Sequence, residues 1–179
     1  MIYYFTPYSW SHDIGKAYND YVKLVPNSED WICLMDGDIM TLTPDFGHQM
    51  QEIITLHPHV GLFTCLVNRV GTLKQCYQDI ISEDPNILSH RKIALQLSKE
   101  KRHIVKEIPN PISGHLMLFK KATWESIGGF PEDRGILSVD NTFSNRMARH
   151  GYKIMVMEGI YCFHFYRLDT GRHDKSHLK

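Results

Sequence analysis

The chain has 179 residues, of which 42% are hydrophobic, so it is long enough to bury one substantial core and short for two full domains. Lysine plus arginine and aspartate plus glutamate both number 20. This balance excludes an overall field that would attract nucleic acid or an anionic membrane. We therefore expect one domain over residues 1–179, no nucleic-acid partner, and charges that act locally.

Cysteine usage and the apolar runs bear on the cellular compartment. The chain has four cysteines and no CxxC pair, which favours buried free thiols in a reducing cytosol. The longest apolar runs, near 31–35 and 59–67, are too short to span a membrane, and the first residues lack the pattern of a signal peptide. The sequence thus predicts a cytoplasmic protein with no transmembrane segment.

The first third of the chain alternates between segments typical of strands and of helices. Residues 2–5 are strand-prone and end at a Thr-Pro pair. Behind Asp13, a reasonable N-cap, apolar residues recur at three-and-four spacing and predict a helix over 13–24. Residues 31–35 form a continuous apolar run, which is typical of a strand buried on both faces.

The remainder of the chain continues this alternation. Thr43-Pro44 has the cap-then-proline signature of a helix start, and that helix should end before Pro58. We further expect strands over 60–67, 115–119, 152–157 and 161–165, and helices over 86–101, around 124–127 and over 138–150. The pattern predicts an α/β fold with a mixed, mostly parallel sheet flanked by helices. Such sheets bind ligands beyond the carboxyl ends of their strands.

An acidic triplet, Asp36-Gly37-Asp38, follows the predicted strand 31–35 directly. Two carboxylates one residue apart can both turn toward a hard cation, while Gly37 lets the backbone come close to a ligand. The alternative is a solvated acidic turn, but like charges at the end of a buried strand are costly unless they have a use. The triplet therefore predicts a site for a divalent cation.

Five motifs together carry a resemblance to a known family. Trp31-Ile-Cys-Leu-Met-Asp-Gly-Asp38 resembles the DxD motif of GT-A glycosyltransferases, especially the family-2-like inverting enzymes. Gly15-Lys-Ala-Tyr-Asn19 is similar to the helix that precedes the DxD strand there, and Thr6-Pro-Tyr8 to the end of the first strand. The other matches are Ser113-Gly-His-Leu-Met-Leu-Phe119 with Ile127-Gly-Gly-Phe130, Val139-Asp140-Asn141, and His164-Phe-Tyr-Arg167.

The resemblance implies a single GT-A-like domain with a shortened nucleotide-binding half. Residues 1–67 would form the donor and metal half, 68–102 a variable lid or acceptor segment, and 103–179 the acceptor half with the C-terminal tail. It implies an inverting transfer from a nucleotide-diphosphate sugar to a glycan, lipid-linked or protein acceptor. Mn²⁺ or Mg²⁺ would be the cofactor, because a divalent ion stabilises the leaving diphosphate. A homo-oligomer is left open.

The same resemblance implies roles for individual residues. Asp38 would be the principal metal ligand, Asp36 would bind the ion or the ribose, and His164 would complete the ligands. A lone histidine of this kind is otherwise more often structural. The contacts to the nucleotide would come from Thr6, Asn19 and Tyr8, the last able to stack on its base.

An inverting mechanism also needs a general base near the incoming hydroxyl. Asp140 matches the place of the family's base and falls in the first turn of a predicted helix, where the positive end of the dipole should keep it ionised. Its alternative is a helix-capping acid. Glu132 and Asp133 are reserve candidates. Arg167 and Lys175 are candidates for phosphate contacts, with a solvated tail as the alternative.

One departure from the family pattern keeps other functions open. Two further strand–helix units usually lie after the first strand, whereas here residues 9–12 alone join Tyr8 to Asp13. A non-catalytic binding or assembly module is therefore an alternative. A haloacid-dehalogenase-like phosphatase is a second, since Leu34-Met-Asp-Gly-Asp-Ile-Met-Thr41 resembles its motif. However, the threonine comes one position late and no later Asp-Asp pair follows.

Overall fold

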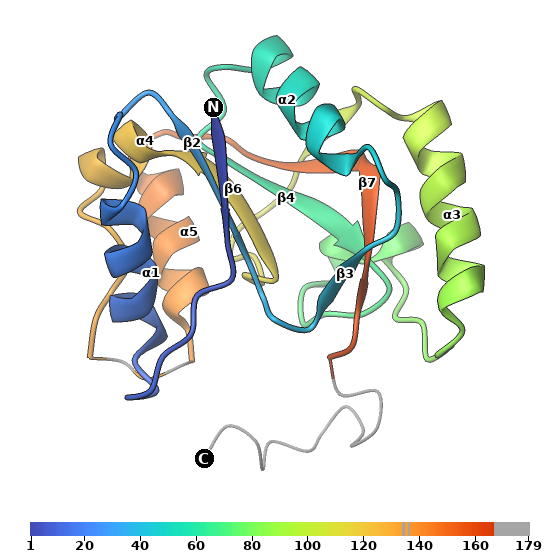
Figure 1. The fold of residues 1–179 in the computed structure, drawn as a ribbon, viewed down its shortest axis with the longest axis horizontal. Coiled ribbons are helices and arrows are strands. Elements are labelled where there is room, and N and C mark those ends of the chain that lie inside the picture. Colours follow the sequence, from blue (N-terminus) through green and yellow to red (C-terminus); the bar gives the residue numbers. More distant parts are fainter. Residues whose placement is uncertain (134, 136, 167–179) are drawn as a thin grey trace.

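The fold is built on a seven-stranded sheet within the described residues, which are 1–133, 135 and 137–166 of this computed structural model (Figure 1). The strands are β1 (Ile2–Phe5), β2 (Trp31–Met35), β3 (Ile39–Thr41), β4 (Leu62–Val67), β5 (Val105–Glu107), β6 (Leu116–Lys120) and β7 (Ile154–His164). Their order across the sheet is β1-β2-β6-β4-β7-β3, and β5 pairs with β7 as well.

The predicted mixed sheet is confirmed. β1, β2, β4 and β7 run in one direction and make up most of the sheet, while β3, β5 and β6 run the opposite way. Because β6 lies between β2 and β4, most neighbouring pairs are nevertheless antiparallel. The carboxyl ends of β2, β4 and β7 therefore point toward the same end of the sheet.

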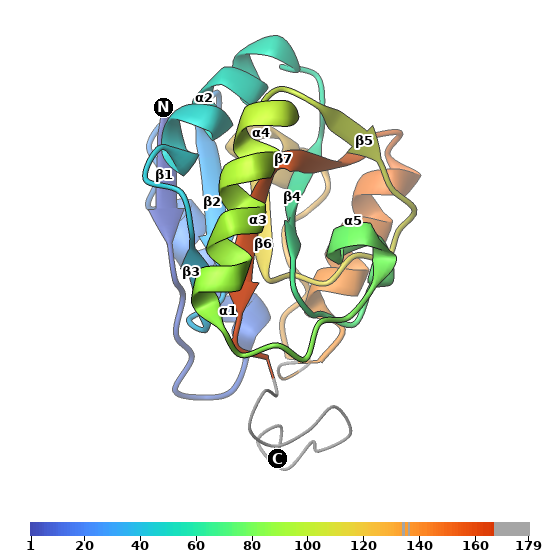
Figure 2. The same ribbon diagram turned by 90° about the vertical axis from the view of Figure 1, so that its right-hand side faces the viewer.

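Helices flank the sheet on both faces. They are α1 (Ile14–Lys23), α2 (Phe46–Leu56), α3 (Ile87–Glu100), α4 (Lys121–Ser126) and α5 (Val139–Arg149), with short 3-10 turns η1 (Leu73–Gln75) and η2 (Tyr77–Asp79). α1 and α5 pack on one face of the sheet and α2 on the other, while α3 lies along β7, at the far side of the molecule from α1 (Figures 1 and 2). Across the described residues, no helix combines the length and apolar character needed to cross a membrane.

Two of the five α-helices that the structure describes, α1 and α3, begin with a side-chain cap, and one predicted helix start is corrected. Asp13 caps α1 as predicted, since its side chain accepts a hydrogen bond from the Lys16 amide (3.1 Å). α2 does not start at Thr43-Pro44 but behind Asp45, because residues 44–45 make a turn before the first helical residue. Arg102 holds Asp45 in this place through an ion pair of 2.6 Å.

The strand predictions needed two corrections. The two segments expected over 152–157 and 161–165 form one strand, β7, whose register against β4 jumps from Met157 to Tyr161. Residues 158–160 look like a break in the sequence, yet the missing side chain of Gly159 lets the strand pass close to the Lys101 carbonyl, 2.6 Å from an added Cβ. β3 and β5 were not predicted, because each has three residues, too few to show the alternation of apolar and polar side chains that indicates a strand.

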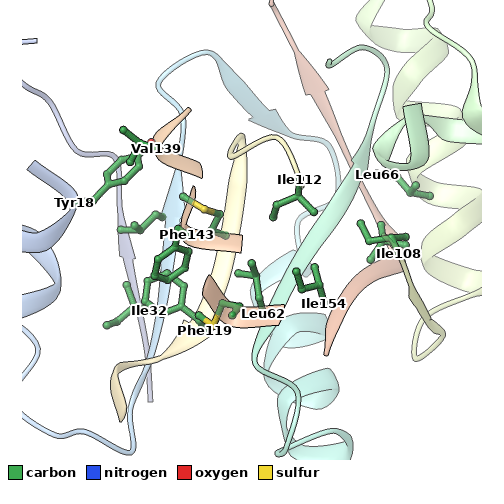
Figure 3. Packing of buried hydrophobic residues seen from close by; sticks show 14 of the residues in the cluster. Tyr18, Ile32, Leu62, Leu66, Ile108, Ile112, Phe119, Val139, Phe143 and Ile154 are labelled. Carbon is green, nitrogen blue, oxygen red and sulfur yellow. The ribbon is translucent and has the colours of Figure 1, made fainter. Parts of the chain in front are cut away.

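Alternation along β2 divides the core between the two faces of the sheet. Ile32 and Leu34 face α1 and α5, whereas Trp31 and Cys33 face α2. Figure 3 shows the hydrophobic cluster that contains Ile32, in which the rings of Phe119 and Phe143 pack with centroids 5.2 Å apart. The four cysteines are buried free thiols, as predicted.

The segment 68–102, predicted to be a variable lid or acceptor segment, contributes α3 to this core. α3 packs along β7 through buried Ala94 and Leu97. His90 is buried as well and shares a hydrogen bond of 2.7 Å with the Tyr161 hydroxyl. α3 is therefore packed against the sheet, and the role of the segment stays a prediction.

Candidate functional site

The acidic triplet forms the turn that leads from β2 into β3. The Asp36 amide donates to the His115 carbonyl (3.0 Å), which extends the pairing of β2 with β6 by one step. β3 then pairs with the end of β7, with Ile39 opposite His164. The Phe165 amide donates to the Asp38 carbonyl (3.0 Å). The short strand β3 is therefore the element that brings the first third of the chain to its last strand.

Asp36, Asp38 and His164 converge at this point. One possible ligand atom from each lies within 4.8 Å of the others, as expected for side chains that can share one ion. His164 Nε2 is 3.2 Å from Asp38 Oδ1. His164 is buried, while the Asp38 side chain is about half exposed, so the group opens toward solvent on one side.

The chain around Asn68 fixes the orientation of the His164 ring. Asn68 makes two hydrogen bonds to the His164 backbone, accepting from its amide (2.7 Å) and donating to its carbonyl (3.1 Å). The ring nitrogen Nδ1 lies 2.9 Å from the Arg69 carbonyl, which accepts the Nδ1 proton. Nε2 is thereby directed at the two aspartates, the arrangement typical of a metal-binding histidine and its supporting hydrogen bond.

The two aspartates differ in their electrostatics. Burial raises the pKa of Asp36 from its ordinary 3.8 to about 7; His164 and the Tyr18 hydroxyl oppose the rise, whereas nearby Asp38 and Asp140 add to it. Burial also pushes the pKa of Asp38 upward, but the hydrogen bond and charge of His164 leave it below its ordinary value. An ionised Asp36 is thus costly unless a cation lies beside it.

A cavity of about 220 Å³ adjoins the triplet. Its walls combine the end of β2, the loop after β1, the first turn of α1 and the start of α5: Pro7, Ile14, Tyr18, Met35, Asp36, Gly37, Gly114, Val139 and Asp140. Two carboxylates, those of Asp36 and Asp140, face this space, and no lysine or arginine is among its described lining residues. The cavity is therefore acidic on the side that touches the triplet.

Asp140 is held rigidly at the cavity wall. It is the second residue of α5, whose N-cap is Ser138, so Asp140 is not the N-cap itself, although its carboxylate does accept from a first-turn amide. Its Oδ2 accepts from the Gly114 amide (2.7 Å) and its Oδ1 from the Asn141 amide (2.8 Å). A Cβ on Gly114 would stand 2.8 Å from Asp140 Cβ, so only glycine permits this approach.

The protonation of Asp140 departs from the expectation. The helix start was expected to keep this carboxyl readily ionised, but burial outweighs the amide hydrogen bonds and raises its pKa. A raised pKa makes the carboxylate a stronger base once it is ionised.

The residues predicted to contact the nucleotide are dispersed. Thr6 lies beside the triplet, its Cγ2 3.7 Å from a Cβ built on Gly37. Tyr8 is 68% exposed and is not among the residues that line the cavity. Asn19 requires a correction, because all four hydrogen-bonding positions of its amide are used inside the fold, by Phe130, Trp124 and Glu132. Its role is to hold the turn after α4.

The reserve candidates for the base lie off the cavity. Glu132 is exposed and accepts from the Asn19 amide (2.7 Å), and the exposed Asp133 lies beside the α1 cap, its backbone amide donating to Asp13 (2.9 Å). Neither lines the cavity next to Asp36. Arg167 and Lys175, the candidates for phosphate contacts, lie outside the described residues.

Several site residues were missed from the sequence. Tyr18, which counted only as an apolar position of the first helix, lines the cavity and hydrogen-bonds Asp36. Asn68 and Arg69 follow β4 and position His164, and a polar pair directly after a buried strand was the available signal.

The chain matches no protein-family model and no curated protein. No family is shown, and the functional conclusion depends on the geometry of the site.

Proposed function

We propose that the chain is a metal-dependent inverting glycosyltransferase that moves a sugar from a nucleotide-diphosphate sugar to a glycan, lipid-linked or protein acceptor. One observation carries this proposal: the ligand atoms of Asp36, Asp38 and His164 come within 4.8 Å of one another at the edge of a cavity that also contains Asp140. A cation site and a candidate base thus share one space. A cytoplasmic location is part of the same proposal.

The donor set suits Mn²⁺ well, and Mg²⁺ second. Two carboxylate oxygens and one imidazole nitrogen combine hard ligands with a nitrogen that manganese accepts more readily than magnesium does. The acidic cavity also needs a cation before a diphosphate can approach, since its described lining contains no positive side chain. A bound ion would supply Lewis-acid stabilisation of the leaving diphosphate.

The chain itself contributes the positions of the reacting groups. His164, held by Asn68 and the Arg69 carbonyl, would bind a cation together with Asp38 and Asp36, of which Asp36 also lines the cavity. Asp140, fixed by the Gly114 amide, is positioned to take the proton of an acceptor hydroxyl in the same cavity. Thr6 and Tyr8 remain the predicted contacts to the nucleotide.

A screen of nucleotide sugars tests the proposal. Purified protein with Mn²⁺ is expected to hydrolyse or transfer sugar from at least one of a panel of UDP-, GDP- and CDP-sugars. Asp38→Ala should abolish this turnover, and Asp140→Asn should reduce transfer far more than donor binding. Asp45→Ala is the matched control, because Asp45 belongs to a surface ion pair. Full activity of Asp38→Ala, or phosphomonoester hydrolysis abolished by Asp36→Asn, would contradict the proposal.

A non-catalytic binding or assembly module is the second candidate. β1 is the last strand at its edge of the described sheet, and the chain goes from it through a short loop to α1. The strand–helix units that build much of the nucleobase pocket in the resembled family are therefore not found between β1 and α1. Calorimetry with Mn²⁺ and nucleoside diphosphates separates the two candidates: metal-dependent binding with turnover supports the enzyme, and binding of neither ligand supports the module.

A further inference from the structure

The loop between β1 and α1 exposes two large aromatic side chains next to the candidate site. Trp10 is 88% exposed and Tyr8 is 68% exposed. Their rings meet edge to face, with centroids 5.5 Å apart and planes at 88°. An indole with this much of its surface in water gives up the burial that usually stabilises such a side chain, and a binding role offsets that cost.

Both ends of this loop are built into the cavity wall. Pro7 and Ile14 line the cavity, so residues 8–13 form an arch that starts and ends at the site. The arch is fixed internally, because the Ser9 hydroxyl donates to the Asp13 carbonyl (3.0 Å). Asp13 in turn accepts from the amides of Lys16 (3.1 Å) and Asp133 (2.9 Å). Trp10 is therefore presented from an anchored loop.

We propose that Trp10 is the platform on which a neutral saccharide, the acceptor of the transfer, rests. The electron-rich face of an indole attracts the weakly positive C–H groups on one face of a pyranose ring. The Tyr8 ring lies edge to face with the indole, and the hydroxyls of Ser9 and Ser11 lie on either side of Trp10 in the chain. This inference rests on the proposed transferase function.

The surrounding charge favours a neutral ligand over an anionic one. Carboxylates of Asp36 and Asp140 face the cavity, and that of Asp13 lies at the end of the loop, where the nearby cation, Lys16, is paired with Asp20 (2.7 Å). A nucleoside diphosphate would be repelled without a cation, whereas an uncharged sugar would not. Saccharide binding at Trp10 should therefore be independent of metal, in contrast to binding of the donor.

The tryptophans of the chain provide a selective reporter. Trp31 is 5% exposed in the core, and Trp124 donates its indole N–H to Asn19 (2.9 Å). Quenching of tryptophan emission by acrylamide therefore reports mainly on Trp10. In chelator-treated protein, neutral trisaccharides (cellotriose, maltotriose and chitotriose) are used as probes. At least one should protect the emission from quenching in a saturable way.

Substitutions then locate the binding. Ligand-observed NMR titration should show that Trp10→Ala weakens trisaccharide binding at least tenfold (about 1.4 kcal/mol), whereas Trp10→Phe retains most of the affinity. Leu56→Ala, which changes an exposed apolar residue of α2, is the matched control. Melting curves verify that each variant is folded, which is expected because Trp10 has little buried surface.

Metal-dependent binding of UDP, GDP or CDP is measured on the same samples. If Mn²⁺ and a nucleotide bind but Trp10→Ala leaves the trisaccharide affinity unchanged, or no trisaccharide binds, the platform is wrong and the transferase proposal stands. Trp10-dependent binding of uridine alone also overturns the platform. If trisaccharides bind through Trp10 while nucleotides never bind, the platform stands and the transferase fails.

Discussion

Two groups of acidic side chains in this protein have opposite electrostatic surroundings. Arg102 pairs with Asp45 (2.6 Å) and Glu52 (2.7 Å) at the surface, and these contacts lower the pKa of both carboxyls. At the end of β2, burial raises the pKa of Asp36 and Asp140, and no lysine or arginine is among the described residues around their cavity.

This difference indicates the role of each group. The Arg102 cluster, defined as Arg102, Asp45 and Glu52, carries its own cation and ties α2 to the chain after α3. The cavity acids, defined as Asp36 and Asp140 in the cavity lining together with Asp38 beside Asp36, are neutralised only in part, by His164. A group of largely enclosed like charges that the fold balances only in part is the arrangement expected where a cation binds from outside.

The largest effect is expected from removing a ligand from the cavity acids. Asp38→Ala should weaken Mn²⁺ binding about 100-fold or more, because few protein ligands remain to hold the ion. Titration followed by the EPR signal of free Mn²⁺ measures this loss. Asp45→Ala removes a carboxylate from the Arg102 cluster instead and should leave Mn²⁺ affinity unchanged. Equal losses in both variants would remove the contrast between the two groups.

A smaller loss is expected when the support of His164 is removed. Asn68→Ala deletes both side-chain hydrogen bonds to the His164 backbone, and loss of such support typically costs 10- to 100-fold in metal affinity. Asn27→Ala, at an exposed turn on another part of the surface, is the control. If Asn68→Ala melts like the parent protein and binds Mn²⁺ equally well, Asn68 does not position the histidine.

The stability of the metal-free protein should reveal the cost of an ionised Asp36. Its folded pKa of about 7 lies above the ordinary 3.8, so the carboxylate destabilises the fold above pH 7, and this cost disappears as the pH falls toward 4. In chelator at pH 8, Asp36→Asn should therefore raise the free energy of unfolding by up to about 4 kcal/mol, because a shift from 3.8 to about 7 corresponds to that cost. The gain should shrink at pH 5, as measured by thermal melts. Destabilisation at pH 8 would contradict the proposed cost.

The Arg102 cluster should show the smallest effect. Arg102→Ala breaks ion pairs that are largely exposed, and such pairs contribute about 1 kcal/mol or less each. The free energy of unfolding from urea titration should fall by about 1 kcal/mol, with no change in Mn²⁺ affinity. A change in metal affinity would show that the surface cluster and the cavity are coupled.

The sequence predicted the parts of the fold that have long, clear patterns. The apolar run 31–35 and the helical spacing behind Asp13 became β2 and α1, and the acids were placed correctly at the end of β2. Their meeting with His164 depends on β3, which is too short to show a period. The sequence could suggest that meeting only through a family resemblance.

The roles of polar side chains were harder to predict than the elements that carry them. Asn19 was expected to contact the nucleotide, but in the folded protein its side-chain amide hydrogen-bonds Phe130 and Trp124. Tyr18, one residue earlier, has its hydroxyl at Asp36 instead. Two neighbouring residues of α1 therefore have different roles: Asn19 makes a structural contact, and Tyr18 faces the cavity. Only the packing of α1 against the rest of the fold determines which residue has which role.

The most direct test of the central claim is crystallography of the protein with Mn²⁺, using anomalous scattering at the manganese absorption edge. The account predicts one strong anomalous peak within coordination distance of Asp36, Asp38 and His164 Nε2, beside the cavity that contains Asp140. No peak at these three residues, or a peak at another acidic group such as Asp45 and Glu52, would contradict it.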